Sequence, residues 1–446
     1  MVGPSPRDDA VIAGPETSGR SGFGVNYLPA YAGLAMWRDF RPGEIRPDLE
    51  ALRSEGVADV RCFLSWPDFM PTPDAVDAEM MEHLASFLEI LDGLGLRVQV
   101  TLLVGHMSGT NWVPPWITDP SAMYSDPDLR SAQAVYVRAV ARCGRRFDSV
   151  ESYCLSNEST RLTGPADDDV VGAWAEDLCR AVKEEHPAAM VALGDGAWYV
   201  LGERNGFRPT HAQDVIGPHL YLADTDPDRL VAGHGLAVGL AVALAEGRPV
   251  WLEEFGAPHS VFGEDQIAEF AEGVTVEARL QGAERVYWWS GIDVSTADAL
   301  PYEHHAFELT FGVLRADRTA RPASKALRQA TAAELPDLPE AGLLVPSYLH
   351  EVYPFSFDDP ELILRTLRTA YAALRRLGFC PRVVLERDLD AANDVPELLV
   401  APSVQKLLAP TWERLEARPG RLLFSYLHGS SYFHGAWTHR ARTFFG

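Results

Sequence analysis

Two short segments of the chain carry carboxylic acids at matching places. Residues 149–158 (SVESYCLSNE) end on Glu158, and residues 249–256 (PVWLEEFG) carry Glu254 just before a Phe-Gly pair. Both segments are rich in strand-forming residues and are followed by turn-forming residues. Glycoside hydrolysis needs two carboxyl groups that face each other across the scissile bond. Two strands ending in acids therefore indicate one site able to do this chemistry.

The spacing of the two acids indicates the elements that position them. Glu254 lies 96 residues after Glu158, which is the length of about three βα units. This places the acids after strands four and seven of a (β/α)8 barrel, whose active sites lie at the carboxyl ends of the strands. The fold class predicted is α/β, a TIM barrel. Strand signals fall at residues 23–27, 57–64, 97–104, 149–156, 189–193, 215–221, 250–253 and 284–289, with helical apolar spacing between most of them.

Residues 155–158 (LSNE) resemble the Asn-Glu strand end of glycoside hydrolase family 5, and residues 253–256 (EEFG) resemble its Glu-Phe-Gly strand end. The resemblance covers residues 22–335. Within the family, the general character of the sequence resembles that of bacterial β-mannosidases. It implies Glu158 as the acid/base and Glu254 as the nucleophile of a double displacement with retention. It implies no metal and no organic cofactor.

Several further residues fit this resemblance. Arg61 lies in the second strand, where a buried guanidinium needs an anion, and the family pattern pairs it with the nucleophile. His219 and Tyr221 share one face of the sixth strand at period two, and the resemblance places them beside Glu254. Asn157 is expected to contact the sugar 2-hydroxyl.

Aromatic and polar residues at other strand ends are expected to line the sugar site. These are Asn26 after the first strand, His106 after the third, Trp112 and Trp116 in the following loop, and Trp289 or Trp288 after the eighth. Trp289 fits the family pattern better than Trp288. An exposed aromatic ring can stack on a pyranose ring, but Trp112 and Trp116 are equally suited to ordinary packing.

Two expectations concern the acids themselves. Glu253 is a rival of Glu254, and because neighbouring strand residues face opposite sides, only one of them should point into the barrel mouth. The Glu-Phe-Gly pattern selects Glu254. Glu158 is expected to stay protonated, partly because of the negative charge on Glu254.

The length of 446 residues allows more than one domain. We expect a leader over residues 1–21, the barrel over 22–337 and a smaller domain over 341–446. Strands and helices alternate in this last part, which predicts a small parallel, flavodoxin-like sheet. It resembles the trimerisation domain of family 42 β-galactosidases, so a homotrimer is possible. It lacks a Gly-rich nucleotide motif, so no cofactor is expected there.

The remaining features exclude other classes of function. A net charge of −24 argues against nucleic acid as a partner. Five scattered cysteines indicate neither a disulfide framework nor a zinc site. His304-His305 lacks a third metal ligand at usable spacing, and the serine in residues 105–109 (GHMSG) is misplaced for a nucleophile elbow. With no apolar signal at the start and no membrane-length apolar run, we expect a cytoplasmic protein whose substrate is imported.

Together these observations predict an exo-acting β-glycosidase, with a β-mannosidase favoured by the resemblance. Its substrate would be a small β-linked oligosaccharide such as mannosyl-β-1,4-N-acetylglucosamine. Long loops after strands three and eight favour a pocket over an open cleft. An endo-acting β-mannanase or cellulase is the alternative within the class, and a non-catalytic carbohydrate-binding barrel is the alternative outside it.

Overall fold

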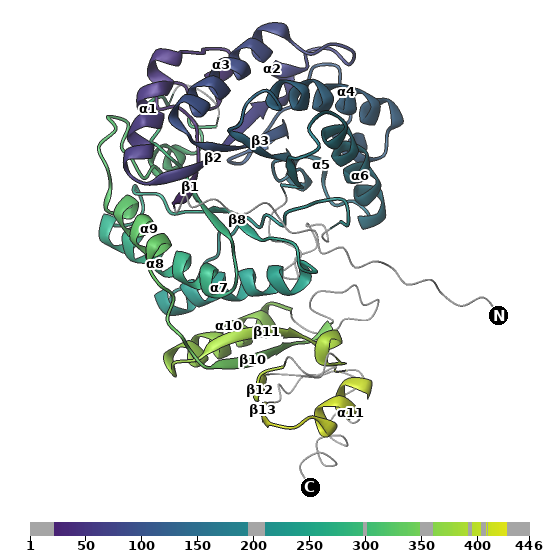
Figure 1. Ribbon diagram of the computed structural model, residues 1–446, viewed down its shortest axis with the longest axis vertical. Helices are drawn as coiled ribbons and strands as arrows, with labels where there is room; N and C mark the ends of the chain where they lie inside the picture. Colours follow the sequence, from purple (N-terminus) through teal and green to yellow (C-terminus); the bar gives the residue numbers. More distant parts are fainter. Residues whose placement is uncertain are drawn as a thin grey trace, which may run out of the picture.

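The computed structural model describes residues 22–194, 210–297, 301–347, 360–390, 395–402, 407 and 409–425. The expected leader, residues 1–21, lies outside the described residues. Two sheets organise the chain: a large curved one at the top of Figure 1 and a smaller one below it. Within the described ranges, no helix combines the length and the apolar character needed to cross a membrane.

The large sheet is a parallel barrel, which confirms the predicted fold class. Its strands pair in the order β7-β6-β3-β2-β1-β9-β8. Residues 215–219 close the ring, because Val215 bridges Ala192 of β7 while Ile216 and His219 bridge the β8 side at Val250 and Glu254. The expected regular strand over 215–221 is reduced to these bridges, since Pro218 has no N–H to donate. The strands are β1 (Phe23–Asn26), β2 (Val57–Ser65), β3 (Arg97–Val104), β6 (Val150–Ser156), β7 (Met190–Ala192), β8 (Trp251–Phe255) and β9 (Arg285–Trp289).

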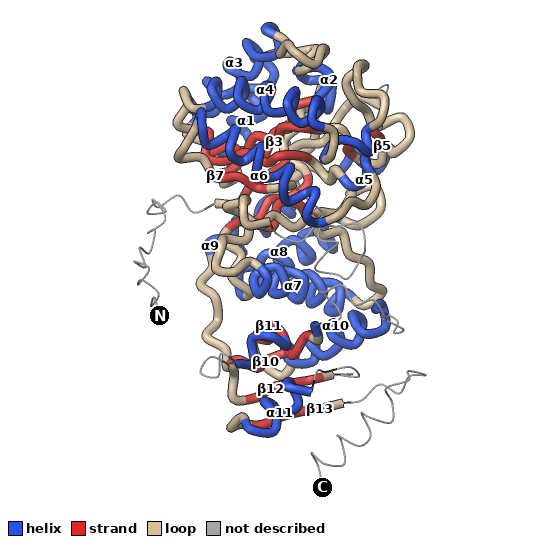
Figure 2. Tube along the Cα trace, turned by 90° about the vertical axis from the view of Figure 1, so that its right-hand side faces the viewer, coloured by secondary structure: helices blue, strands red, loops and turns tan. Residues whose placement is uncertain are grey.

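Helices surround the barrel on its outer side (Figure 2). Several begin at an aspartate whose side chain caps the first turn: Asp77 accepts from the N–H groups of Glu79 and Met80, and Asp126 precedes a proline at the first helical position. The helices are α1 (Pro42–Ser54), α3 (Ala78–Leu94), α4 (Pro127–Gly144), α6 (Asp168–Glu185), α7 (Pro227–Leu244), α8 (Glu264–Leu280) and α9 (Pro322–Ala332).

Short elements lie mostly near the carboxyl ends of the strands, where the loops are long. They are α2 (Trp66–Phe69), α5 (Thr160–Thr163), the two-residue strands β4 (His106–Met107) and β5 (Thr110–Asn111), and the 3-10 helices η1 (Gly33–Trp37), η2 (Pro120–Tyr124) and η4 (Ala306–Thr310).

The smaller sheet is also parallel, with the order β11-β10-β12-β13. Numbered along the chain, this is the 2-1-3-4 order of flavodoxin-like folds, as predicted. Its elements are β10 (Glu340–Val345), α10 (Pro360–Arg376), β11 (Cys380–Leu385), the 3-10 helix η6 (Glu386–Asp390), β12 (Leu398–Ala401), α11 (Ala409–Ala417) and β13 (Arg421–Phe424).

Helix α7 lies between the barrel and the smaller sheet (Figure 1). Its residues from Ala232 to Ala241 are all buried, because both sides of the helix are covered. Glycines allow the close approach: a Cβ on Gly235 would lie 2.5 Å from the Tyr371 hydroxyl, and one on Gly239 would lie 2.9 Å from Val383. One apolar cluster consequently runs from the barrel into the smaller sheet.

Candidate active site

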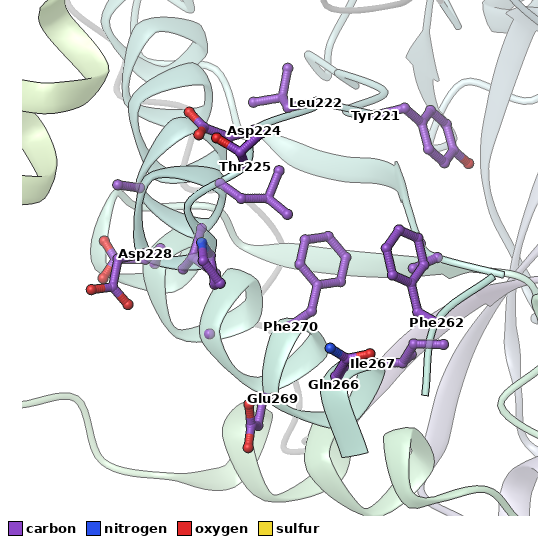
Figure 3. A pocket seen from close by; sticks show the side chains of 18 of the residues that line it. Tyr221, Leu222, Asp224, Thr225, Asp228, Phe262, Gln266, Ile267, Glu269 and Phe270 are labelled. Carbon is purple, nitrogen blue, oxygen red and sulfur yellow. The ribbon is translucent and has the colours of Figure 1, made fainter. Parts of the chain in front are cut away.

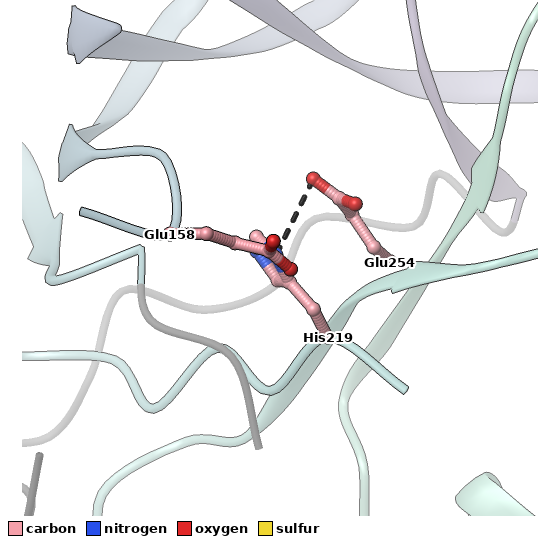
Figure 4. A group of neighbouring side chains, drawn as sticks. All are labelled: Glu158, His219 and Glu254. Atoms are coloured by element: carbon pink, nitrogen blue, oxygen red, sulfur yellow. Dashed lines mark hydrogen bonds and ion pairs between the residues drawn. The ribbon is translucent and has the colours of Figure 1, made fainter. Parts of the chain in front are cut away.

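The side chains of Glu158 and Glu254 meet at the carboxyl ends of the barrel strands. Glu158 follows β6, and Glu254 lies near the end of β8. One carboxylate oxygen of each, together with a ring nitrogen of His219, lies within 4.8 Å of the others. Figure 4 shows the three side chains converging from separate segments of the chain. The fourth and seventh strand positions thus bring the two acids together.

The backbone at Glu158 is held in an uncommon conformation. Its φ is +45°, in the left-handed region that residues other than glycine seldom adopt. Its N–H donates to the carbonyl of Gly194, 2.8 Å away at the end of the fifth strand. Gly194 itself has φ +78°, and a Cβ there would lie 1.9 Å from the Ser156 carbonyl oxygen. This turn aims the Glu158 side chain into the barrel mouth, and such strain is typical of functional sites.

Arg61 connects four strands of the barrel beside Glu254. The guanidinium is fully buried and donates to Glu254 Oε1 through Nη1. It also donates to Asn26 Oδ1 at 3.1 Å and to Asn157 Oδ1 at 2.9 Å. Asn26 in turn donates to the Glu253 carbonyl at 3.0 Å. Asn26 therefore acts in this structure by fixing Arg61, and Arg61 supplies the positive charge that a buried carboxylate needs.

His219 lies between the two acids. Its Nδ1 is 3.1 Å from Glu158 Oε1 and 3.4 Å from Glu254 Oε1. Burial disfavours the charged imidazolium, but the Glu254 carboxylate and hydrogen bonds to Glu158 and Glu253 raise the pKa of His219 to about 9. Tyr221 donates its hydroxyl to Glu254 Oε2 at 3.1 Å. Both oxygens of Glu254 are thus held by donors.

The charge state of Glu158 differs from the expectation. Burial favours its neutral form, but the hydrogen bond and positive charge of His219 outweigh it and, with Arg161 and His106, lower the pKa of Glu158 to about 2. Arg161 donates to Glu158 Oε2 at 2.9 Å. The prediction that Glu158 is protonated in the empty site is therefore wrong, because it considered Glu254 and omitted His219 and Arg161. The opposite directions of the two pKa shifts favour an ion pair between His219 and Glu158.

Glu253 also points into the barrel, contrary to the alternation argument. The β8–β9 register shifts between Leu252 and Phe255, so the strand bulges at the two glutamates. A bulge adds one residue and places consecutive side chains on the same face. Glu253 Oε2 lies 3.5 Å from His219 Nε2, and Gln99 donates to Glu253 Oε1 at 2.7 Å. Glu253 therefore supports His219 from below while Glu254 faces the mouth.

The strand-end aromatic residues divide between the site and the packing of the fold. Trp289 packs edge-on against Phe63 at the barrel mouth, with an exposed fraction of 6%. Trp288 is fully buried against Phe255 and Phe270, on the helix side of β9. This ordering agrees with the preference for Trp289 over Trp288 as the residue that faces the sugar.

The residues after β3 lie close to Glu158 or behind it. His106 Nε2 is 3.9 Å from Glu158 Oε2, and burial lowers the pKa of His106. Trp112 packs against the mouth cluster that contains Trp289, and its buried indole N–H has no hydrogen-bond partner among the described residues. Trp116 packs against Trp66 and donates to the Met70 carbonyl at 3.0 Å. A sugar contact by Trp116 stays a prediction.

Sequence reasoning missed a third carboxyl group, that of Glu308 in η4. Its Oε2 accepts from the indole N–H of Trp289 at 3.0 Å. Burial, opposed by hydrogen bonds from Trp289 and Ser108 and assisted by the charges of Glu254 and Glu158, raises the pKa of Glu308 to about 7. No local pattern marks this residue, because it lies in an irregular loop. Arg161 was also missed. It lies in the short helix α5, one turn beyond Glu158.

Glu158, His219 and Glu254 also have the spacing of a three-ligand metal site. The surrounding charges favour proton chemistry over cation binding. Arg61 already pairs with Glu254, and Arg161 with Glu158, so a divalent ion would lie beside two guanidinium groups. The predicted double displacement needs no metal.

An apolar groove adjoins the site. It runs between α7 and α8 toward α10, with a volume of about 870 Å³. Figure 3 shows Tyr221 at one end, Phe262 and Phe270 along the wall, and Asp228 at the other end. Tyr221 lines the groove and also contacts Glu254, so the groove opens beside Glu158 and Glu254 and does not enclose them.

Comparisons with known proteins support the fold. No protein-family model matches the chain, and no curated protein matches its sequence. Solved structures do match. The exo-β-1,4-mannosidase Op5Man5 from Opitutaceae bacterium strain TAV5 is 24% identical, with a TM-score of 0.78 over 90% of this chain and 76% of that one.

Two further matches are GH5_18 proteins. The one from Streptomyces cattleya, solved with Manβ1-4GlcNAc, is 24% identical, with a TM-score of 0.73 over 90% of this chain and 98% of that one. The one from Bifidobacterium longum subsp. longum ATCC 55813 is 21% identical, with a TM-score of 0.72 over 88% of this chain and 100% of that one. At these identities the likeness establishes the fold. The shared fold agrees with the resemblance to family 5 glycoside hydrolases.

Proposed function

We propose that this chain is a retaining β-glycosidase. The observation that carries the proposal is the separation of the two acids, one oxygen of each lying within 4.8 Å of the other at the carboxyl ends of the barrel strands. Carboxyl groups of retaining enzymes are about 5 to 5.5 Å apart, whereas inverting enzymes need about 6.5 to 9.5 Å to admit a water molecule. The fold shared with glycoside hydrolases adds support.

Within this class we propose an exo-acting β-mannosidase that releases mannose from small β-linked oligosaccharides. The structural neighbours include an exo-β-1,4-mannosidase and a protein solved with Manβ1-4GlcNAc, so that disaccharide is the first substrate to test. Exo action is favoured because the loops after β3 and β9 touch: a Cβ on Gly109 would lie 2.9 Å from His305 Nε2, and Ser108 bonds Glu308. This contact walls one side of the mouth.

The charges in the site suggest how the proton is supplied. At neutral pH the Glu158–His219 pair holds one proton, and the apparent pKa values belong to the pair. Transfer from His219 Nδ1 across 3.1 Å makes Glu158 the acid and leaves a neutral imidazole. As Glu254 bonds the anomeric carbon, Glu158 protonates the departing oxygen. Glu158 then takes a proton from the attacking water, the bond to Glu254 breaks, and the sugar leaves with its β configuration.

The decisive test is turnover of a panel of nitrophenyl β-glycosides, with the first-formed anomer followed by NMR. We expect the β-mannoside to be cleaved fastest and the β-anomer to appear first. Appearance of the α-anomer would refute retention. Shortening of mannan or cellulose without release of monosaccharide would indicate an endo-acting enzyme, and no turnover at all would indicate a binding protein.

Two variants separate the roles of the acids. Glu254→Gln should lower kcat on every substrate by on the order of 10³-fold or more, because no covalent intermediate forms. Glu158→Ala should lower kcat/KM for Manβ1-4GlcNAc by about 10²- to 10⁴-fold. The loss should be much smaller for a dinitrophenyl glycoside, whose leaving group needs no proton. Azide should rescue Glu158→Ala and give a β-glycosyl azide. Equal losses on both substrates would contradict the acid role.

A further inference from the structure

Glu308 is a half-buried carboxyl group that the two-acid mechanism does not use. It is held from two directions, by the indole N–H of Trp289 at 3.0 Å and by the hydroxyl of Ser108. Trp289 ends the eighth strand and Ser108 follows the third, so the carboxyl group joins the two loops that wall the mouth. Among the described residues, no ion pair links it to a basic side chain.

This placement leaves Glu308 close to two other acids and partly open to a ligand. The carboxyl group is close enough to Glu254 and Glu158 for both negative charges to raise its pKa. Its contacts with Trp289 use one oxygen, Oε2, which leaves acceptor capacity on the other. Buried carboxyl groups that have neither a cation nor a full set of hydrogen bonds are typical of functional sites. Sugar hydroxyls are donors that would complete the set.

The barrel geometry indicates which part of the sugar Glu308 faces. Glu158 follows the fourth strand position and Trp289 ends the eighth, and these are opposite in a ring of eight. The leaving group must lie on the side of the acid Glu158. The edge of the sugar ring remote from the leaving group therefore points toward Trp289 and Glu308. In an exo-acting enzyme that edge carries free hydroxyls.

We propose that Glu308 is a specificity-determining residue that hydrogen-bonds hydroxyls at the non-reducing edge of the terminal sugar and so selects chain ends. The proposal rests on the function proposed above. Its chemical target is a terminal hexopyranose with unsubstituted hydroxyls on the 3, 4 or 6 positions. A sugar that continues the chain at the contacted position lacks the donor and would clash with the joined loops.

The test is a cycle of protein and substrate changes. The substrate is the nitrophenyl β-glycoside that the chain cleaves best, with its 3-, 4- and 6-deoxy forms, and the variants are Glu308→Ala and Glu308→Gln. For the wild type, removing the contacted hydroxyl should lower kcat/KM by about 10- to 100-fold. Glu308→Ala should show a similar loss on the full substrate and little further loss on that deoxy form. Glu308→Gln should retain part of the rate.

A control variant and a stability measurement keep the test specific. Glu303→Gln changes an exposed acid in the same loop, paired with His304 at 3.3 Å, and should leave kcat/KM unchanged. Thermal unfolding of each variant checks that the loops remain folded. The inference is overturned if the loss of kcat/KM caused by Glu308→Ala is the same on every deoxy substrate as on the full substrate. The glycosidase function would still stand. If the wild type cleaves no β-glycoside, the underlying function is the part that fails.

Discussion

At the scale of single residues, the site is a set of carboxyl groups whose charges are set by a few neighbours. Arg61 and Tyr221 donate hydrogen bonds to the two oxygens of Glu254, the proposed nucleophile. The pKa of His219 is raised and that of Glu158 is lowered, so in the proposed mechanism His219 supplies the proton that Glu158 passes on. Glu253 lies beneath His219 and favours its charged form. The catalytic proton is thus a property of this cluster and not of one side chain.

Replacement of His219 tests this assignment. In the wild type, activity should fall as pH rises through about 9, because the Glu158–His219 pair then loses its proton. In His219→Asn, Glu158 must hold the proton alone, so the alkaline limb of kcat/KM should move to lower pH by about 1 unit or more. A pH–rate profile of both proteins measures the shift, and an unmoved alkaline limb would contradict it.

The same group makes stability depend on pH. The pKa of His219 is raised in the folded state, so its contribution is fully present below its unfolded pKa of about 6.5. It fades as pH rises through about 9. The difference in Tm between wild type and His219→Asn should therefore be larger at pH 6 than at pH 10. Thermal scans at the two values check this, and a constant difference would refute the linkage.

At the scale of elements, the strand ends are shaped by departures from regular geometry. The bulge in β8 turns both Glu253 and Glu254 inward, and the left-handed turn after β6 aims Glu158 across the mouth. Gly217 leaves space for the inward Glu253: a Cβ at this position would lie 2.1 Å from the carboxyl carbon. The inward Glu253 in the β8 bulge therefore requires a residue without a side chain at Gly217, in the irregular sixth strand position.

Gly217→Ala should therefore destabilise the fold and impair the site. The added methyl must displace a buried carboxyl group, which we expect to cost about 1 to 3 kcal/mol. Activity should fall as well, because Glu253 contacts His219. The matched control is Gly172→Ala in α6, where nothing lies within 4 Å of the new methyl and stability should rise by about 0.5 to 1 kcal/mol. Urea unfolding measures the stability of the two variants, and kcat measures their activity. Equal changes in Gly217→Ala and Gly172→Ala would contradict the prediction.

At the scale of the whole molecule, the smaller sheet completes the packing of the barrel. It covers the outer side of α7, and Glu277 of α8 accepts hydrogen bonds from Tyr371 at 2.8 Å and Arg375 at 2.7 Å across the contact. Division of the chain into domains near residues 338–340 stays a prediction, as does a homotrimer built through the C-terminal part. Light scattering of the purified protein would test the trimer.

Substitutions of two acids at this contact should lower the free energy of unfolding by very different amounts. Glu277→Ala removes the buried carboxylate that accepts from Arg375 Nε and the Tyr371 hydroxyl, at an expected cost of about 3 to 5 kcal/mol. Asp228→Asn breaks an exposed pair with Arg376 across the same contact and should cost less than about 1 kcal/mol. Denaturant unfolding compares the variants. Similar costs would indicate that the contact contributes little to the fold.

The sequence by itself determined the features that depend on short-range pattern. The lengths of βα units predicted the barrel and the strand ends of Glu158 and Glu254, and the alternation of strands and helices predicted the smaller sheet. These signals are local, because a strand or a helix shows its period within a few residues. Arg61, His219 and Tyr221 were selected because the family pattern places such residues at the predicted second and sixth strands.

Only the tertiary structure decided how the site is charged and enclosed. The bulge that turns Glu253 inward, the salt bridge of Arg161 and the carboxyl group of Glu308 depend on contacts between distant segments or on irregular backbone. Such contacts leave no periodic trace in the sequence. The proton on His219 follows from the same cause, since a pKa is set by every charge nearby in space, whatever its position along the chain.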